Sequence, residues 1–286
     1  MNTNLTRRKF LGGAAAACAF SILRPRAAAA ESAAPGLGFP LEDLHVHLDN
    51  STLEKVLPLA RERGVKFGIV EHAGTKENKY PVVLSNDAEL KRYIAMLDGK
   101  PVYKGIQAEW TDWMGCFSPA ALAQLDYVLS DTMTFPGKEG RRTKLWEPGF
   151  PIDDPQGFMD RYVDWHVEIL AKEPLDILAN TSWLPGPLAA DYDRLWTPAR
   201  VQKVAEAAVK YGVALEISAS YKLPKLPFLE QAKAAGVKFS FGSNGRYPNM
   251  GKLDYSLAMA RELSLKREDI FTPAPDGQKA VQRRRF

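Results

Sequence analysis

The sequence predicts an α/β barrel built from seven strand–helix units, and three observations support this prediction. Short apolar runs alternate with amphipathic segments from Leu41 onward. Capping residues mark where those segments begin and end. Polar side chains gather where the apolar runs stop. Strict alternation of strand and helix favours parallel strands with right-handed crossovers, and so many units more often close into a barrel than stay open.

Seven apolar runs are the predicted strands, and each has polar residues at or near its C-terminal end. They are 41–48 (LEDLHVHL), 65–72 (VKFGIVEH), 102–110 (VYKGIQAEW), 125–131 (LDYVLSD), 174–181 (PLDILANT), 213–219 (VALEISA) and 237–244 (VKFSFGSN).

Six amphipathic segments that follow these runs are the predicted helices. They cover 52–63, 87–97, 155–171, 198–211, 227–235 and 253–263, and a long loop follows the fourth strand. Helix starts are indicated by Ser51 and by the Ser-Pro and Thr-Pro pairs at 118–119 and 197–198. Gly64, Gly212 and Gly236 follow helices and can adopt the left-handed cap conformation.

The first thirty residues have the pattern of a twin-arginine export signal. Arg7 and Arg8 precede an apolar run at 10–23 and an alanine stretch that ends at Ala30, the expected cleavage site. A membrane anchor and a lipoprotein signal at Cys18 are the alternatives, but the run is short and Cys18 lacks the usual leucine before it. We expect an exported, periplasmic protein without a stable membrane anchor after cleavage.

This signal sets the expected domain organisation. Residues 1–30 are the signal, 31–40 a linker, 41–272 the barrel and 273–286 a C-terminal tail. The chain has 38 basic and 34 acidic residues, but five of the basic residues lie in the signal, which leaves 33 against 34. A nearly neutral protein gives no indication of nucleic-acid binding. Only Cys116 remains after cleavage, so a metal site would need histidine, carboxylate or amide ligands.

Chemistry is expected where the strands end. His45 and His47 are two residues apart, so on a regular strand their side chains point to the same side and could hold one ion. His72 and Glu109 end the next two strands and complete the predicted metal site. An ordinary strand that happens to carry two histidines is the alternative. His166 lies inside a helix, where we expect it to pack.

The loop 133–155 is unusually long and carries Lys138, Arg141, Arg142 and Lys144. It could be a lid that recognises anions, or an ordinary solvated loop.

These motifs resemble the polymerase and histidinol phosphatase (PHP) superfamily over about residues 41–271. The stretch DLHVHLDNST is similar to its opening D-x-H-x-H motif, and Glu71-His72 stands where the family usually has Asp-His. The position of Glu109 is similar to that of its metal-bridging glutamate. The resemblance implies a distorted (β/α)7 barrel, related to the TIM barrel, that hydrolyses phosphoesters with divalent metals.

The chain departs from the family pattern at four ligand positions. Histidines or acids expected near 131–133, at Asn180, at Asn244 and at Arg246 are missing. The resemblance therefore implies a reduced site of one or two ions (Zn, Mn or Fe), with Asp49 and Asp131 as substitute ligands. Asn180, Asn244 and Arg246 are the expected substrate-binding residues.

Three functions follow from this reading. In the first, an exported metal-dependent hydrolase of small anionic substrates, Arg246 steadies the developing anion while Glu71 or Asp131 moves the proton. The second is a ligand-binding pseudoenzyme that has lost its chemistry. The third is an amidohydrolase-like hydrolase, because HVHLD also resembles the start of those barrels, although no histidine follows His166.

Overall fold

The computed structural model describes Met1 and residues 36–49, 51–137 and 140–284. The chain divides into two units, Met1–Ala30 and Glu31–Phe286, and the fold described below is that of the second. The export signal after Met1, its cleavage site, residues 31–35 of the expected linker and Lys138 lie outside the described residues, and the predictions made for them stay predictions. Among the helices that the structure describes, none is long and apolar enough to cross a membrane.

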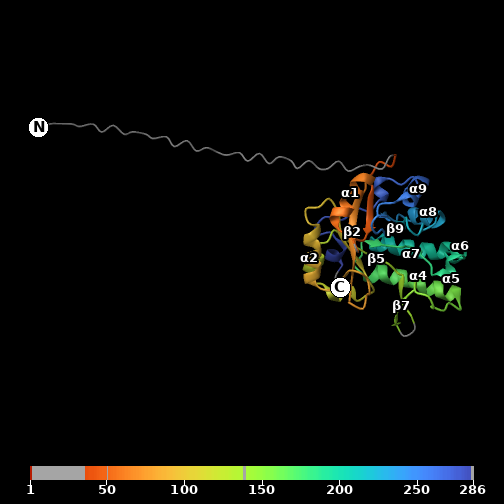
Figure 1. Ribbon diagram of the computed structural model, residues 1–286. Helices are drawn as coiled ribbons and strands as arrows, with labels where there is room; N and C mark the ends of the chain where they lie inside the picture. Colours follow the sequence, from red (N-terminus) through yellow and green to blue (C-terminus); the bar gives the residue numbers. More distant parts are fainter. Residues whose placement is uncertain (2–35, 50, 138–139, 285–286) are drawn as a thin grey trace. The chain divides into compact units, whose positions relative to one another are not determined.

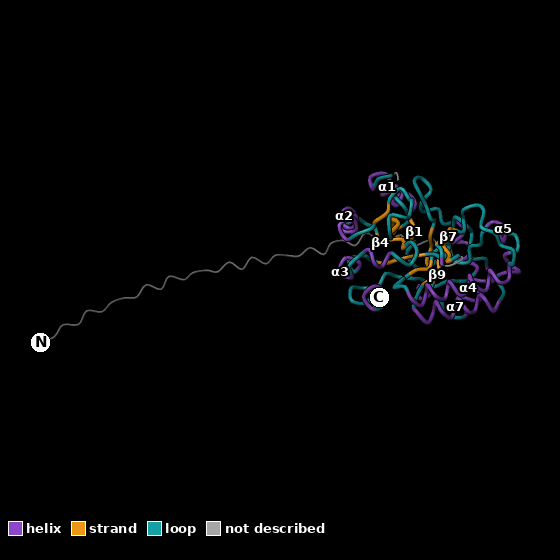
Figure 2. Tube along the Cα trace, turned by 90° about the horizontal axis from the view of Figure 1, so that it is seen from below, coloured by secondary structure: helices purple, strands orange, loops and turns teal. Residues whose placement is uncertain are grey.

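Seven parallel strands form a nearly closed barrel at the centre of the second unit (Figures 1 and 2). Their order in the sheet follows the chain: β1 (Glu42–Val46), β2 (Lys66–Ala73), β4 (Tyr103–Ala108), β5 (Tyr127–Ser130), β8 (Ile177–Leu178), β9 (Ala214–Ser218) and β10 (Phe239–Gly242). β1 is joined to the segment after β10 by a parallel bridge between Val46 and Gly245, in which the His47 N–H donates to the Gly245 carbonyl at 3.0 Å and the Gly245 N–H to the His45 carbonyl at 3.1 Å. The predicted fold class and each predicted strand are confirmed.

The predicted helices are also present, with ends that differ by at most one residue. The longer ones are α1 (Leu53–Arg63), α2 (Asp87–Leu97), α4 (Pro155–Lys172), α7 (Pro198–Tyr211), α8 (Leu226–Ala234) and α9 (Asp254–Glu262), and α4 packs against α7 (Figure 1). The side chain of Thr197 accepts from the Arg200 N–H, as the Thr-Pro signal predicts. The prediction that Ser51 marks the start of α1 is wrong: the N-cap residue of α1 is Thr52, and no side chain forms a capping hydrogen bond there.

The Ser-Pro pair predicted the start of the short helix α3 (Pro119–Leu122), where the Ser118 side chain accepts from the Ala121 N–H. Several other short elements had no clear sequence signal. They are β3 (Val83–Leu84), which pairs with β2, the antiparallel hairpin of β6 (Thr134–Pro136) and β7 (Arg142–Lys144), η1 (Trp113–Cys116), α5 (Gly186–Ala189), α6 (Tyr192–Leu195), η3 (Arg267–Asp269) and α10 (Ala280–Arg283). Ala280 and Val281 are buried, so part of the expected C-terminal tail belongs to the folded unit. The long loop 133–155 contains the β6–β7 hairpin.

Tyr127 fills the inside of the barrel beneath the strand ends. Its hydroxyl donates to the Leu44 carbonyl at 2.7 Å, so the ring crosses from β5 to β1. Gly68 and Gly105 make room for the ring, because a Cβ at Gly68 would lie 2.2 Å from the Tyr127 hydroxyl oxygen. The glycines of β2 and β4 are therefore required by this packing.

Gly105→Ala should destabilise the fold by about 1–3 kcal/mol, the usual cost of overpacking a core. The new Cβ would lie 2.6 Å from Tyr127 Cζ and 2.8 Å from Val70 Cγ1, and neither atom is at the free end of a flexible side chain. Urea unfolding of the variant measures the loss. Gly186→Ala is the matched control because no atom lies within 4 Å of its Cβ position, and an equal loss in both variants would contradict the packing argument.

Candidate metal centre

A layer of polar side chains lies across the barrel where the strands end. Its members are almost all buried, unlike the polar residues of an ordinary protein surface. It contains His45, His47, Glu71, His72, Gln107, Glu109, Asp131, Asn180 and Glu216. Buried polar groups need partners, so the hydrogen bonds of this layer indicate which side chains are left to bind something else.

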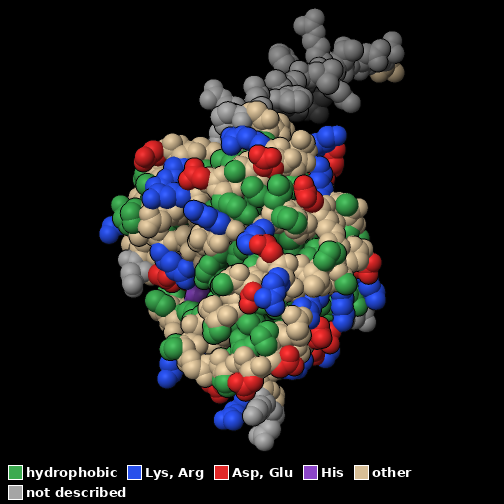
Figure 3. All heavy atoms as spheres, turned by 90° about the vertical axis from the view of Figure 1, so that its right-hand side faces the viewer, with side chains coloured by type: hydrophobic (Ala, Val, Ile, Leu, Met, Phe, Trp, Pro, Cys, Tyr) green, Lys and Arg blue, Asp and Glu red, His purple; other side chains and the backbone are tan. Residues whose placement is uncertain are grey.

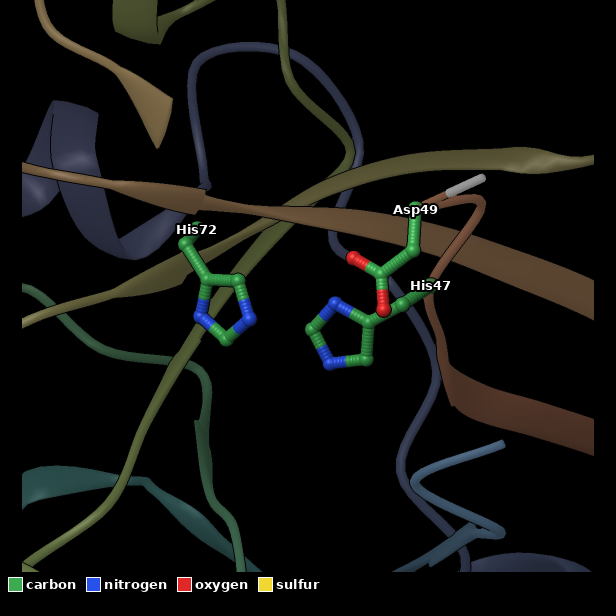
Figure 4. Close-up of side chains that lie close together, drawn as sticks. All are labelled: His47, Asp49 and His72. Atoms are coloured by element: carbon green, nitrogen blue, oxygen red, sulfur yellow. The ribbon is translucent and has the colours of Figure 1, made fainter. Parts of the chain in front are cut away.

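His47, Asp49 and His72 form a cluster whose candidate ligand atoms all lie within 4.8 Å of one another. The two imidazole rings face each other with centroids 4.6 Å apart, and the Asp49 carboxylate lies beside His47 (Figure 4). Both ring nitrogens of His47, Nε2 of His72 and Oδ1 of Asp49 are buried without a hydrogen-bond partner. Two imidazoles and one carboxylate are a common ligand set for a catalytic zinc ion, so the cluster fits a divalent metal.

His45 is engaged elsewhere. Its Nδ1 lies 2.7 Å from Glu216 Oε1, and its Nε2 lies 3.0 Å from Gln107 Oε1. Burial acts to lower the pKa of His45, but the Glu216 carboxylate and these hydrogen bonds raise it above its ordinary value overall. We expected His45 and His47 to converge on one ion, whereas the structure groups His47 with His72 and Asp49 and gives both nitrogens of His45 protein partners.

Glu109 contacts the cluster through His72. Its Oε1 lies 2.7 Å from His72 Nδ1, and its Oε2 accepts from the Tyr80 hydroxyl at 3.2 Å. A carboxylate on one ring nitrogen holds the imidazole and leaves the other nitrogen for a metal. Burial raises the pKa of Glu109 to about 7. Glu109, a predicted ligand, thus lies behind His72 and outside the three-residue cluster.

Tyr80 covers the other side of His72. Its ring stacks on the imidazole with centroids 3.5 Å apart and an interplanar angle of 9°. Burial, with a smaller contribution from the Arg246 charge, lowers the pKa of His72 to about 3, which keeps the ring neutral, as a metal ligand must be.

Of the two carboxyl groups predicted to act in acid–base chemistry, Glu71 is buried and Asp131 is half-buried. Glu71 Oε1 accepts from the Leu48 N–H at 3.1 Å, whereas Oε2 has no partner. Burial, with a smaller contribution from the Asp49 charge, raises the pKa of Glu71 to about 7. Burial also raises the pKa of Asp131, to about 6. Asp131 Oδ2 accepts from Gln107 Nε2 at 3.3 Å and from Asn180 Nδ2 at 3.1 Å, so this carboxyl group is already held by amides.

The predicted substrate-binding residues lie at two strand ends. Arg246 Nε lies 2.8 Å from Asp49 Oδ2, and the same guanidinium donates to the Asn244 carbonyl. The Arg246 side chain is 42% exposed, so part of it faces solvent. Asp49, Asn180 and Asn244 have φ values of 44°, 50° and 45°, a left-handed conformation that is uncommon outside glycine and often marks functional sites.

The sequence analysis missed Gln107 and Tyr80 as members of the site, and it gave no role to Glu216, although Glu216 lies at the end of a predicted strand. Gln107 lies two residues before Glu109, so strand alternation could have placed it on the same side. Glu216 is a charged residue within an apolar strand, a signal that it has a buried partner. Tyr80 lies in a loop and had no such signal. On the face shown in Figure 3, a small part of a histidine is visible between basic and hydrophobic side chains.

No known protein family's sequence profile matches the chain, and no curated protein sequence matches it. Among solved structures, the chain is similar to histidinol phosphate phosphatase from Lactococcus lactis subsp. lactis, crystallised with zinc, L-histidinol and phosphate. The TM-score is 0.55 at 14% identity, over 85% of this chain and 98% of the phosphatase. A second solved structure, of an uncharacterized protein, aligns with 80% of this chain and 71% of that protein's chain at 9% identity. Its TM-score of 0.34 is too low to indicate a shared fold. The chain thus has the distorted (β/α)7 barrel fold of the histidinol phosphate phosphatase, a PHP fold.

Proposed function

We propose that the protein is a metal-dependent hydrolase of small phosphoesters that holds one divalent ion at His47, Asp49 and His72. The observation that carries this proposal is the convergence of their unpartnered buried atoms within 4.8 Å. Leaving such atoms without partners is costly unless a ligand satisfies them. The phosphatase with the same fold was crystallised with zinc and phosphate, which supports the choice of ion and of substrate. Export through the signal at 1–30 is part of the proposal.

The number of ions follows from the partners of the remaining polar groups. His45 has protein partners on both nitrogens, and Asn180 offers only a neutral amide. A carbonyl oxygen is a weaker ligand than a carboxylate for such ions. One ion therefore suits this chain better than the larger set of the PHP superfamily.

Each neighbouring side chain has a defined task in this proposal. When bound, the ion supplies a Lewis acid that polarises an ester oxygen and activates water. Arg246 presents a guanidinium beside Asp49 and binds the anionic substrate. Glu71 and Asp49 line the same cavity of about 390 Å³, so the unpartnered Oε2 of Glu71 is placed to accept a proton.

Glu71→Gln should lower the rate of phosphoester hydrolysis by about 10²–10⁴-fold, the usual contribution of a general base. The amide keeps the acceptor for the Leu48 N–H but cannot take a proton. Steady-state hydrolysis of a generic aryl phosphate, measured with the metal content of each preparation, tests this. Equal rates in the variant and the wild type at equal metal content would exclude Glu71 as the base.

A ligand-binding pseudoenzyme is the second candidate, because the Arg246–Asp49 ion pair and the partners of His45 satisfy part of the site without any ion. Metal analysis of the full-length protein from zinc-supplemented cells separates the two. One zinc per chain with hydrolysis of mono- or diesters supports the hydrolase. Zinc without hydrolysis of these esters or of amides supports the binder, and absence of zinc excludes the proposed metal site.

A further inference from the structure

A groove of about 1130 Å³ lies beside the β6–β7 hairpin and the first half of α4. Figure 1 shows β7 next to α4. Basic side chains dominate its charged lining: Lys79, Arg141, Arg142, Lys144 and Arg161 face only Glu77 and Glu147. The protein after residue 30 is almost neutral, so this local excess of positive charge is a property of the groove.

Most of this charge is not neutralised within the protein. Lys79, Arg141 and Arg161 form no ion pair with any other residue that the structure describes. Lys144 lies 3.6 Å from Glu147 Oε1, and that carboxylate is 61% exposed. A pair with one solvent-exposed partner at this distance is weak, so Lys144 can still bind an anion. Arg142 is paired with Asp112 at 3.7 Å, whereas the exposed side chains of Lys79, Arg141 and Arg161 are able to bind an anion directly.

Two side chains connect the groove with the metal centre. Lys144 Nζ lies 5.6 Å from the centroid of the Tyr80 ring, and that ring stacks on His72. Arg142 lies over the Trp110 ring at 5.9 Å, and Trp110 directly follows Glu109 in the chain. One wall of the groove is therefore also an outer wall of the metal centre, and a single ligand could reach both.

We propose that the groove binds a second anionic group of the substrate, so that the preferred substrates are small molecules with two separated phosphate or similar groups. This inference rests on the proposed function, in which the first phosphate lies at His47, Asp49, His72 and Arg246. Phe135 and Phe150 also line the groove and can pack against the carbon skeleton of such a molecule. Arginine binds phosphate through two parallel hydrogen bonds, which favours phosphate over a diffuse negative charge.

Calorimetric titration of the full-length, zinc-loaded protein tests the inference. The probes are short and long alkanediol bisphosphates and the alkyl monophosphates of the same lengths. At least one bisphosphate should bind about tenfold more tightly than its monophosphate, as expected for an added charge-assisted contact. The double variant Arg141→Gln/Arg161→Gln should lose this preference. Lys55→Gln/Lys210→Gln removes two exposed charges from α1 and α7 and should keep it.

The outcomes separate this inference from the proposed function. If monophosphate binds in a zinc-dependent manner but bisphosphate binds no more tightly, the groove proposal is wrong and the metal site is supported. The same conclusion holds if bisphosphate binds more tightly and the groove variant keeps this preference. If the bisphosphate preference disappears only in the groove variant, and neither zinc nor His47→Ala changes the binding of either ligand, the groove proposal is supported and the proposed metal site is wrong. Absence of binding by every probe overturns both.

Discussion

His47→Ala should abolish stoichiometric metal binding and, with it, hydrolysis. His47 is one of the three proposed ligands, and both of its ring nitrogens are buried without a protein partner. Even residues that only support a metal ligand contribute about 10–100-fold to metal affinity, so loss of a ligand from a set of three should weaken zinc binding by more than about 100-fold. Competition titration with a zinc chelator measures the affinity, and elemental analysis measures the zinc content.

His166→Gln is the matched control for this experiment. His166 is also buried, but its Nδ1 lies 2.7 Å from the Tyr162 carbonyl and its Nε2 lies 3.1 Å from the Thr132 hydroxyl, so it has partners on both nitrogens. We expect this variant to keep its zinc even if its stability falls. Equal zinc contents in the His47 and His166 variants would show that the metal centre is not where we place it.

Asp43→Ala should destabilise the protein by about 3–5 kcal/mol, because it leaves several buried donors without an acceptor. Asp43 is completely buried, and its carboxylate accepts from the Ser243 N–H at 2.9 Å, the Ser243 hydroxyl at 2.5 Å and the Gly251 N–H at 2.7 Å. These bonds join β1 to the segment after β10, where one backbone bridge closes the barrel. The first residue of the D-x-H-x-H stretch thus acts as a structural clamp.

Urea unfolding of Asp43→Ala and of Glu62→Ala measures this contribution. Glu62 lies on the exposed side of α1, and its replacement should change the free energy of unfolding by less than about 0.5 kcal/mol. Metal affinity supplies a second readout, because His45 and His47 follow Asp43 in the same segment. A variant as stable as the wild type would mean that the barrel closes without the Asp43 hydrogen bonds.

Local signals were sufficient to predict the secondary structure of the barrel. The seven apolar runs became the seven parallel strands, and Gly64, Gly212 and Gly236 follow their helices with φ values of 63°, 68° and 89°. Each of these signals depends on a few neighbouring residues. The β6–β7 hairpin was not predicted because its strands are short and lie in a charged loop, and its pairing is decided by contacts outside the segment.

The composition of the site was predictable only in part. His47 and His72 could be expected to meet because parallel strands end at the same edge of a barrel, and Asp49 was among the substitute ligands. The spacing of the two histidines also placed His45 near His47, but spacing along one strand does not show which side chains of other strands lie within hydrogen-bond distance of His45. The partners of His45 are Gln107 and Glu216, which lie 62 and 171 residues away along the chain.

The sequence alone therefore established the α/β barrel, the edge at which its chemistry lies and the residue types that gather there. Tertiary structure decided which of those residues pair with one another and which keep free ligand atoms. The reason is physical: a side chain's availability depends on every group within hydrogen-bond reach in three dimensions. Strand alternation predicts the side of the strand to which a side chain points. The distances between the site's side chains are set by the register shift between Asp43 and Val46 and by the residues on the facing strands.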